Sequence, residues 1–446
     1  MAERLSAREV VTALADDATF AELPAPARKS RPDGPLAWPG YDDSRARAAE
    51  RTGEQESVVC GTARVGGVRA VLIAFEFGFL GGSLGERTGD RLEAAYAYAR
   101  ERRLPVVPLV ATGGSRMQEG MLALTQLQRV ARQSALNREA GLAQVAVLRD
   151  PTTGGGWATL GAGADVVLAL PGAQVGFAGS RVRPADADPA AYTAEAQVAA
   201  GAADAVVGPQ ELRETLGRWL RLLTRPSTTP APPPGPLGES AVLPVTGWDA
   251  VRRARSPQRP RVGAYLDAYF TERTAISGDR CGGTDPEGML CGFGTHEGRT
   301  VAYAAQTGTA TRPAGYRTAA RLIRLADRLG IPVLTLVDTP GAANDAEAER
   351  QGAGAAIADL FGAVAGARTP VTTLVIGEGG SGGALALAAP GNTWATPDSY
   401  FSVIAPELAA AILKRPPREV ESTADQLRIR PQDLVELGVI RGTVGG

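Results

Sequence analysis

Cysteine and histidine, the side chains that most often build metal centres, disulfides and acid–base sites, are scarce in this chain of 446 residues. The three cysteines, Cys60, Cys281 and Cys291, lie too far apart for CxxC pairs, and a single histidine, His296, accompanies them. This spacing supports neither a zinc site nor a disulfide framework. We therefore predict reduced cysteines and no bound metal.

The chain also lacks an excess of either charge and any long apolar run. Lys plus Arg (47) nearly equals Asp plus Glu (48), which excludes the broad basic surface of a general nucleic-acid or anionic-membrane binder. No stretch reaches the roughly eighteen apolar residues of a membrane span, and the charged N-terminus has no apolar signal region. We expect a cytoplasmic protein that binds neither nucleic acid nor a membrane.

A stretch rich in proline, serine and threonine, RPSTTPAPPPGPLGES, divides the chain almost in half. Its composition predicts an exposed, semi-rigid linker. The length on either side is sufficient for one domain each. We predict a peripheral segment over 1–35, a first domain over 36–224, a linker over 225–244 and a second domain over 245–446. Peripheral helices are expected before residue 36 and after Lys414.

The two halves present the same order of elements. In the first half, the helical pattern RLEAAYAYARERR leads to Pro105, the apolar strand VVPLV and the loop ATGGSRMQEG. In the second half, GYRTAARLIRLADRLG leads to Pro332, VLTLV and DTPGAANDAEAER. Pro332 follows Pro105 by 227 positions, and Val375 follows Val147 by 228. The alternation of short apolar strands with helices predicts a tandem duplication of one parallel α/β domain.

Each half has two glycine-containing loops that follow a strand and precede a helix. Backbone N–H groups at such a place are unpaired and attract negative charge. Glycine lets a ligand oxygen approach them, and two N–H groups that converge on one oxygen form an oxyanion hole. These loops contain Gly113-Gly114 and Gly154-Gly155 in the first half, and Gly341 and Gly382-Gly383 in the second.

One of these loops also matches a nucleotide-binding motif, but comparison with its counterpart in the other half favours an oxyanion hole. Gly377, Gly379 and Gly382 match G-x-G-x-x-G after a strand, with Asp398 about twenty residues on. The equivalent loop of the first half reads RDPTTGGG and shares only the last two glycines. Asp398 also follows Pro397 in a turn, whereas a ribose-binding acid should end the second strand. We therefore interpret Gly377, Gly379 and Gly380 as turn geometry that leads into an oxyanion hole.

Acid–base candidates near these loops are few. His296 lies in FGTHEGRT, a pattern that predicts a hairpin turn with a solvated side chain. Ser381 lies in a glycine loop, but it has neither a G-x-S-x-G elbow nor a neighbouring histidine to activate it. Oxyanion holes without a protein base suit a reaction whose substrates bring their own base. The sequence thus indicates enolate chemistry.

Long motifs in both halves resemble one family. FEFGFLGGSLGERTGDR, ATGGSRMQEGMLALTQL, DPTTGGG and GFAGSRV look like the β subunit of the bacterial acetyl-CoA carboxylase carboxyltransferase. GWDAVRRARSPQRPR, RPAGYRTAARLIRLADRLGIPVLTLVDTPGA, IGEGGSGGALAL and YFSVIAPELAAAIL look like its α subunit. The resemblance spans roughly 40–225 and 245–446, so the chain is similar to a fusion in the order β then α.

The resemblance implies the α/β crotonase fold, as two tandem ββα-spiral domains, and biotin-dependent carboxyl transfer to a short acyl thioester. It assigns Gly154 and Gly155 to the thioester oxyanion and Gly382 and Gly383 to the biotin oxyanion. Substrate contacts are expected from Gly113, Gly114, Ser115, Arg116, Gly341, Phe177, Ala178 and Gly179. Biotin contacts are expected from Gly379, Gly380 and Ser381.

The same resemblance implies partners and an assembly. Biotin would arrive on a separate carrier protein charged by a biotin carboxylase, because no Met-Lys biotinylation motif and no carboxylase domain occur in the chain. The acceptor would be an acyl-CoA or an acyl-carrier protein. Sites of this family form between the first domain of one protomer and the second of its partner, so a homodimer or higher oligomer is expected.

The chain departs from the family pattern at several places, and two other functions fit the same loops. It lacks the four-cysteine zinc ribbon, and it has RPADADPAAY where an IEQT-like helix is usual. It has Asn344-Asp345 in place of Pro-Gly, TGTAT after Gln306 in place of a longer basic segment, and a shifted EAERQG. A malonyl-thioester decarboxylase of the same fold would act without biotin. A non-catalytic binding subunit would hold a thioester without turnover.

Overall fold

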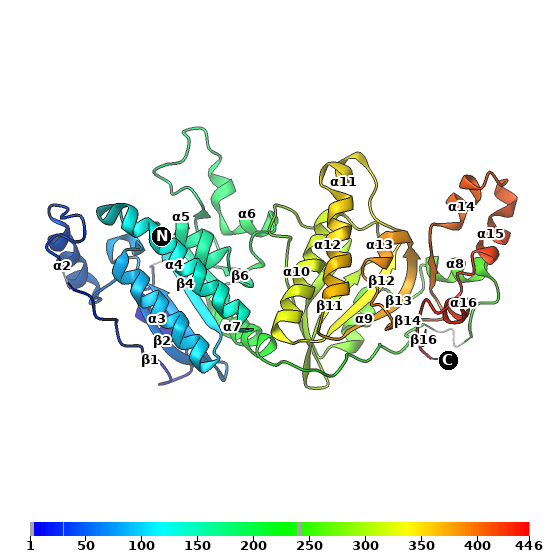
Figure 1. Ribbon diagram of the computed structural model, residues 1–446, viewed down its shortest axis with the longest axis horizontal. Helices are drawn as coiled ribbons and strands as arrows, with labels where there is room; N and C mark the ends of the chain where they lie inside the picture. The colour runs from blue at the N-terminus through cyan, green and yellow to red at the C-terminus, as the bar shows by residue number, and fades with distance from the viewer. Residues whose placement is uncertain (1–3, 30, 239–241, 446) are drawn as a thin grey trace. The chain divides into compact units, whose positions relative to one another are not determined.

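A computed structural model of the chain describes residues 4–29, 31–238 and 242–445. Its internal contacts divide the chain into two compact units, Met1–Thr224 and Arg225–Gly446. The two units are described separately, and both appear in Figure 1. The finer boundaries predicted at 35/36 and 244/245 stay predictions, and residues 239–241 of the predicted linker lie outside the described residues.

The first unit is built on a sheet with strand order β1-β2-β3-β4-β5-β6-β8, and β7 pairs with β5 beyond that path. β1, β2 and β3 are antiparallel neighbours, whereas the strands from β3 onward are parallel. The strands are β1 (Ala21–Glu22), β2 (Val58–Val65), β3 (Val68–Phe75), β4 (Val106–Thr112), β5 (Val145–Thr153), β6 (Val166–Ala169), β7 (Val175–Gly176) and β8 (Ala205–Val206). The helices are α1 (Ala7–Leu14), α2 (Tyr41–Thr52), α3 (Glu86–Arg102), α4 (Gly120–Glu139), α5 (Gly154–Gly156), α6 (Ala194–Ala199) and α7 (Pro209–Leu223), with short turns η1 (Leu80–Gly82), η2 (Met117–Glu119), η3 (Trp157–Gly161) and η4 (Pro189–Tyr192).

The core of this unit explains why α3 and α4 lie side by side across the sheet (Figure 1). Val71 and Ile73 point from β3 into a cluster with Leu92 and Tyr96 of α3 and Val130 of α4. These side chains are almost fully buried. The parallel strands are apolar runs because both of their faces are covered.

The second unit repeats this plan with strand order β16-β14-β13-β12-β11-β10-β9, and β15 pairs with β13. Its strands are β9 (Glu272–Ala275), β10 (Met289–His296), β11 (Arg299–Gln306), β12 (Val333–Thr339), β13 (Val371–Gly380), β14 (Thr393–Ala395), β15 (Tyr400–Ser402) and β16 (Gly442–Thr443). Its helices are α8 (Gly247–Arg255), α9 (Val262–Tyr269), α10 (Pro313–Leu329), α11 (Ala346–Arg350), α12 (Ala353–Gly366), α13 (Ser381–Leu385), α14 (Pro406–Ile412), α15 (Val420–Gln426) and α16 (Pro431–Glu436), with a short turn η5 (Pro417–Glu419).

Strand pairing establishes the duplication and corrects its register. Leu109 pairs with Val147 in the first sheet, and Leu336 pairs with Leu374 in the second. Both strands are therefore related by 227 positions, so Val147 corresponds to Leu374 and not to Val375. Each strand pair also shifts register at the same place, before Thr112 and before Thr339.

Two expectations about the periphery are incomplete. The end segments form helices, but they also contribute the edge strands β1 and β16. The proline-rich stretch is not exposed throughout, because Ala231 is buried in the core of the second unit. Tyr269 donates its hydroxyl hydrogen bond to the carbonyl oxygen of Pro232 at 2.9 Å. A segment without regular secondary structure shows no apolar periodicity in its sequence. It can still pack against a domain where neighbouring side chains form hydrogen bonds with its backbone.

Within the described residues, no helix combines the length and apolar character that crossing a bilayer requires. The three cysteines are free, and Cys60 and Cys291 are buried.

Candidate active site

The loops that follow β4 and β12 have the same internal hydrogen bond. The N–H of Gly114 donates to Oγ1 of Thr112 at 3.0 Å, and the N–H of Gly341 donates to Oγ1 of Thr339 at 3.2 Å. Both glycines have positive φ, +106° and +145°. A residue with a Cβ rarely adopts this conformation, so the tight turn requires glycine in each half.

In each unit, two backbone hydrogen bonds then hold the residue that follows this glycine in place. Leu84 donates its N–H to the carbonyl of Gly114 and accepts from the N–H of Arg116, both at 2.9 Å. Thr311 makes the same two contacts in the second unit, with Gly341 at 3.3 Å and Ala343 at 2.9 Å. The residues between, Ser115 and Ala342, are half-buried, and among the described residues their N–H groups have no acceptor. Each loop thus presents one fixed, unpaired donor.

The loops that follow β5 and β13 supply a second set of donors. Gly154 has φ +63° and begins α5, and Ser381 has φ +57° and begins α13. By strand register these two residues are equivalent, and Gly155 corresponds to Gly382. The first N–H groups of a helix have no acceptor within the helix. The sequence offset of 228 places Gly154 opposite Gly382, so the structure moves the equivalence by one residue.

The two loops of each unit approach so closely that side chains would not fit between them. A Cβ on Gly154 would lie 3.3 Å from Cα of Gly114, and one on Gly380 would lie 2.0 Å from the carbonyl oxygen of Pro340. The structure therefore brings the predicted Gly113-Gly114 loop to Gly154, and the predicted Gly341 loop to Gly380 and Ser381. Each pair of loops forms one glycine cluster, which we call the first and the second glycine cluster.

The glycines of the two clusters differ in the space around them. A Cβ on Gly382 would meet nothing within 4 Å, and this residue is exposed. A Cβ on Gly155 would lie 2.3 Å from Cδ1 of Leu127, and one on Gly383 would lie 2.5 Å from the nitrogen of Ala342. Gly382 therefore faces open space, whereas Gly155 and Gly383 allow neighbouring groups to pack closely.

Two residues that were not predicted from the sequence form hydrogen bonds with the carbonyl oxygen of Gly383. Gln306 donates from Nε2 to the carbonyl oxygen of Gly383 at 3.1 Å, and Tyr316 donates its hydroxyl to the same oxygen at 3.2 Å. Both side chains are buried, and burial raises the pKa of the Tyr316 phenol, which keeps it a neutral donor. Their role was not readable from the sequence because both belong to apolar patterns, at the end of β11 and within α10.

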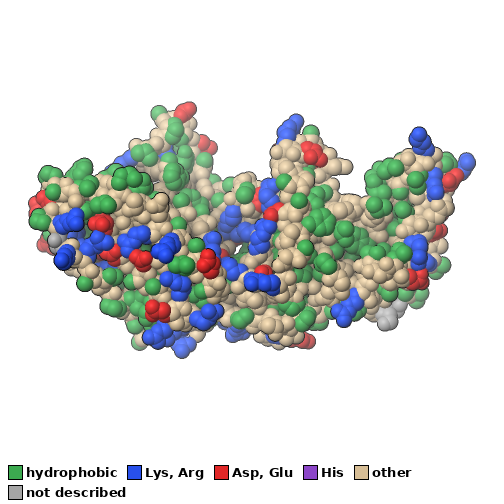
Figure 2. Space-filling model, viewed as in Figure 1, with side chains coloured by type: hydrophobic (Ala, Val, Ile, Leu, Met, Phe, Trp, Pro, Cys, Tyr) green, Lys and Arg blue, Asp and Glu red, His purple; other side chains and the backbone are tan. Residues whose placement is uncertain are grey.

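Phe177, Ala178 and Gly179 follow β7 and border the first glycine cluster. The N–H of Gly154 donates to the carbonyl oxygen of Phe177 at 3.1 Å, while the Phe177 ring is 74% exposed. The equivalent residue after β15, Val403, is also 74% exposed. Each cluster thus has an exposed apolar side chain at its rim. Figure 2 shows several apolar side chains along the upper side of the first unit.

Arg116 does not line the site as predicted. Its side chain is 1% exposed, and its Nη2 lies 2.5 Å from Oε1 of Glu56 and 2.7 Å from the carbonyl oxygen of Ser83. Burial alone would raise the pKa of Glu56, but the charge and hydrogen bonds of Arg116 outweigh it and hold that pKa below its ordinary value. Arg116 therefore anchors the loop from behind, because a buried guanidinium needs a buried counter-charge.

Three glycines do not form the turn that we expected. Gly377, Gly379 and Gly380 belong to strand β13. A Cβ on Gly377 would lie 2.3 Å from both Nη2 of Arg259 and Oδ1 of Asp338, and one on Gly379 would lie 2.6 Å from the Phe401 ring. These glycines therefore make room for a buried ion pair and for an aromatic ring, and the change of direction occurs at Ser381.

His296 lies at the end of the β10–β11 hairpin, as predicted. Its side chain is not solvated, however, because its ring stacks on Tyr269 with centroids 3.7 Å apart, and its Nδ1 lies 2.7 Å from the carbonyl oxygen of Tyr269. These contacts make it a packing residue of the hairpin. In the part of the chain that the structure describes, no three His, Cys, Asp or Glu side chains gather in a way that could hold a metal.

Comparison with known proteins matches both units. Residues 37–212 match the family profile described as carboxyl transferase domain, and residues 238–445 match that of acetyl co-enzyme A carboxylase carboxyltransferase-like proteins. The acetyl-coenzyme A carboxylase carboxyl transferase subunits beta/alpha of Saccharopolyspora erythraea is 38% identical over 91% of this chain and 75% of its own. The protein of the same name from Salinispora arenicola is 39% identical over 99% of this chain and 82% of its own.

Solved structures with the same fold include transcarboxylase 12S with hydrolysed methylmalonyl-coenzyme A bound. It aligns with 99% of this chain and 87% of its own at a TM-score of 0.80, with 21% identical residues. A second transcarboxylase 12S structure aligns over the same shares with a TM-score of 0.78. The predicted fold class, tandem crotonase-like α/β domains, is thereby confirmed.

Proposed function

The chain belongs to the acetyl-CoA carboxylase carboxyltransferase family and is a biotin-dependent carboxyltransferase; we propose that it carboxylates the α-carbon of a short acyl thioester, acetyl-CoA or a related acyl-CoA. The carboxyl donor would be carboxybiotin on a separate carrier protein. A cytoplasmic location stays a prediction.

One observation carries the proposal, namely the same donor geometry in both units. Ser115 and Gly155 offer N–H groups in the first glycine cluster, and Ala342 and Gly382 offer them in the second. Two developing oxyanions need two such sites, one for the thioester carbonyl and one for the ureido carbonyl. In enzymes, removal of one oxyanion donor costs roughly 10²- to 10³-fold in kcat.

The residues fit a flat carbonyl ligand at each cluster. At the second cluster, Gly382 has no side chain and opens to space, while Gly380 and Gly383 let the two loops close on each other. This chain would hold the oxyanion through backbone N–H groups that are already fixed by Thr112, Thr339, Leu84 and Thr311. When bound, carboxybiotin supplies the carboxyl group and the base.

The assignment of ligands to clusters follows the family resemblance. The first cluster, with Gly154 and Gly155, would bind the acyl thioester, and Phe177, Ala178 and Gly179 would border the acyl chain. The second cluster, with Gly382 and Gly383, would bind biotin beside Gly379, Gly380 and Ser381. His296, the single histidine of the chain, packs in a hairpin and would take no part in proton transfer.

The partners and the assembly are part of this proposal. Exposed apolar side chains lie on η2, on α4 and after β7 in the first unit (Met117, Met121, Leu124, Phe177 and Val182), and on α13, after β15 and along and just after α14 in the second (Leu385, Val403, Leu408, Ile412 and Leu413). Apolar patches of this kind usually mark an interaction surface. We therefore expect a homodimer or higher oligomer, with a biotin carrier protein and a biotin carboxylase as separate partners.

The test is a reconstituted reaction. The purified chain is incubated with a biotinylated carrier, biotin carboxylase, ATP, labelled bicarbonate and a panel of acyl-CoA and acyl-carrier thioesters. We expect a labelled carboxylated product from a short acyl-CoA. Absence of product with every acceptor would contradict the proposal.

A parallel arm separates the decarboxylase alternative. The chain is incubated with malonyl-CoA with and without the biotinylated carrier. We expect release of CO₂ only in the presence of the carrier. Release that does not depend on biotin would assign the chain to the decarboxylases, and thioester binding without turnover in either arm would assign it to the binding subunits.

A further inference from the structure

Strand β13 contains a bulge just before the donor loop of the second glycine cluster. The last regular pair joins Val337 of β12 to Val375 of β13. The next pair joins Thr339 to Gly379, so a single residue of β12, Asp338, lies opposite three residues of β13. β13 also changes its other neighbour here, from β14 to β15. The backbone groups of the bulge therefore need partners other than a regular strand ladder.

A buried ion pair supplies two of these partners. Nη2 of Arg259 lies 2.6 Å and 2.7 Å from the two carboxylate oxygens of Asp338, and both side chains are almost fully buried. Oδ1 of Asp338 accepts the N–H of Glu378 at 3.1 Å. Nη1 of Arg259 donates to the carbonyl oxygen of Ile376 at 3.3 Å. Because Gly377 has no side chain, the ion pair lies directly against the backbone of the bulge.

The first unit has the same bulge, between β4 and β5, but a neutral side chain holds it. The hydroxyl oxygen of Thr152 lies 2.8 Å from the carbonyl oxygen of Val110 and 2.8 Å from that of Arg149, so the hydroxyl can donate to either. By strand register, Ala111 corresponds to Asp338, so the first unit has no carboxylate at this position. The two units thus hold one matched bulge with different chemistry.

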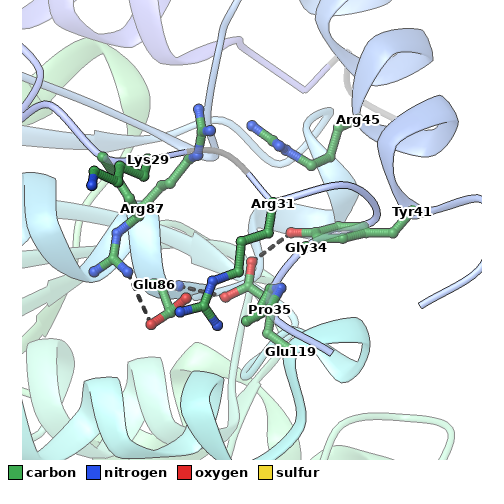
Figure 3. A pocket seen from close by; sticks show the side chains of 10 residues that line it. Lys29, Arg31, Gly34, Pro35, Tyr41, Arg45, Glu86, Arg87 and Glu119 are labelled. Atoms are coloured by element: carbon green, nitrogen blue, oxygen red, sulfur yellow. Dashed lines mark hydrogen bonds and ion pairs between the residues drawn. The ribbon is translucent and has the colours of Figure 1, made fainter. Parts of the chain in front are cut away.

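Buried arginines also act on different loops in the two units. In the first unit, Arg116 lies behind Ser115, and Figure 3 shows two of its partners, Tyr41 and Glu119, with a hydrogen bond between them. By register, Ala343 takes the place of Arg116 in the second unit. A buried ion pair therefore supports the loop after β4 in the first unit, and the end of β13 in the second.

We propose that Asp338 and Arg259 are positioning residues for the second glycine cluster. By fixing the bulge of β13, they set the N–H of Gly382 opposite that of Ala342. Gly382 follows the bulge within four residues, whereas Ala342 belongs to the loop after β12, so a shift of the bulge changes the distance between the two donors. An oxyanion hole depends on the exact placement of its donors. The assignment of this cluster to biotin rests on the proposed function.

The kinetic test uses Asp338→Asn, which removes the charge but keeps the size, and Arg259→Gln, which removes the guanidinium fork. In the reconstituted reaction, kcat should fall about tenfold, less than after complete loss of a donor. KM for the acyl-CoA should stay within about twofold, because a contact that acts only in the transition state lowers kcat alone. The control is Leu360→Ala, a fully buried change on α12, which should lower the unfolding temperature but keep kcat where the protein is folded.

Hydrogen–deuterium exchange of the amides tests the bulge without turnover. Asp338→Asn and Arg259→Gln should speed exchange over residues 376–383 and leave 149–156 unchanged. Thr152→Val, which removes the hydroxyl from the bulge of the first unit, should do the reverse. This measurement needs neither biotin nor a thioester. If the wild-type chain transfers no carboxyl group, the proposed function fails, and exchange alone decides whether the ion pair fixes the bulge.

The combined results support or overturn the positioning role. Faster exchange over 376–383 with lower kcat and unchanged KM supports it. Unchanged exchange over 376–383, or faster exchange there with wild-type kcat, overturns it. Arg259→Lys keeps a charge opposite Asp338 and serves where Arg259→Gln does not fold. It should recover stability more fully than kcat, because an ammonium does not reproduce the fork that reaches Asp338 and Ile376 together.

Discussion

Tyr316 and Gly383 are joined by a hydrogen bond of 3.2 Å from the buried tyrosine hydroxyl to the glycine carbonyl oxygen. Because Gln306 donates to the same oxygen, the carbonyl of Gly383, the third residue of α13, is held by two side chains. Tyr316→Phe removes one of them without changing the packing. We expect kcat to fall roughly tenfold with little change in KM, and stability to fall by about 1 kcal/mol.

Steady-state kinetics and urea unfolding measure these two quantities separately. Tyr98→Phe, on α3 and outside both clusters, is the matched control. If Tyr316→Phe loses stability but keeps its kcat, the hydroxyl supports packing only. A combined Tyr316→Phe and Gln306→Leu variant should lose more activity than the sum of the two single changes, because the carbonyl then has neither side-chain donor.

Gly382→Ala tests the open side of the second cluster. The added methyl meets nothing within 4 Å, so the fold should be unaffected, but it would occupy the space that faces a bound ligand. We expect turnover to fall on the order of 10²-fold, as after loss of an oxyanion donor. Gly354→Ala, at an equally open position in α12, is the control and should retain full turnover. Equal activity of the two variants would place the biotin site elsewhere.

Gly155→Ala tests the first cluster, where packing and chemistry need to be separated. Its methyl would lie 2.3 Å from Cδ1 of Leu127, so the single variant should lose both stability and activity. Adding Leu127→Ala removes the clash and should restore part of the stability. Thermal unfolding and kcat, measured for the single and double variants, separate an effect on stability from an effect on catalysis. If activity returns together with stability, the loss in the single variant comes from the clash with Leu127, and a methyl group at position 155 does not obstruct the substrate.

Glu56→Gln leaves the buried guanidinium of Arg116 without its counter-charge. Breaking such a pair costs about 3 to 5 kcal/mol. The folded pKa of Glu56 lies below its ordinary value of 4.5, so its stabilising effect is full above that value and is lost as the pH falls through the folded pKa. The difference in unfolding free energy from wild type should therefore be largest at neutral pH and should shrink below about 4.5.

Urea unfolding from pH 7 to pH 3 measures this difference. Glu50→Gln, an exposed change on α2, should follow wild type over the whole range. A difference between Glu56→Gln and wild type that stays constant with pH would show that the ionisation of Glu56 does not contribute to stability.

The sequence predicted the fold well because apolar strands, helical patterns and glycine loops recur in both halves. It misplaced the equivalence by one residue because Gly154 and Ser381 look different, although both have positive φ. Backbone conformation, not residue type, defines that position. The family resemblance of its loop places Arg116 among the substrate contacts, whereas its burial follows from an ion pair with Glu56, 60 positions away in the sequence. Contacts between such distant residues leave no local pattern.

The equivalence of Gly154 and Ser381 has a consequence for hydrogen bonding. Glycine at position 154 offers a ligand backbone groups alone, whereas Ser381 also offers a hydroxyl. The Oγ of Ser381 would lie 3.4 Å from a Cβ placed on Gly341. A hydroxyl both donates and accepts. Two copies of one scaffold thus differ in hydrogen-bonding capacity at a single matched position.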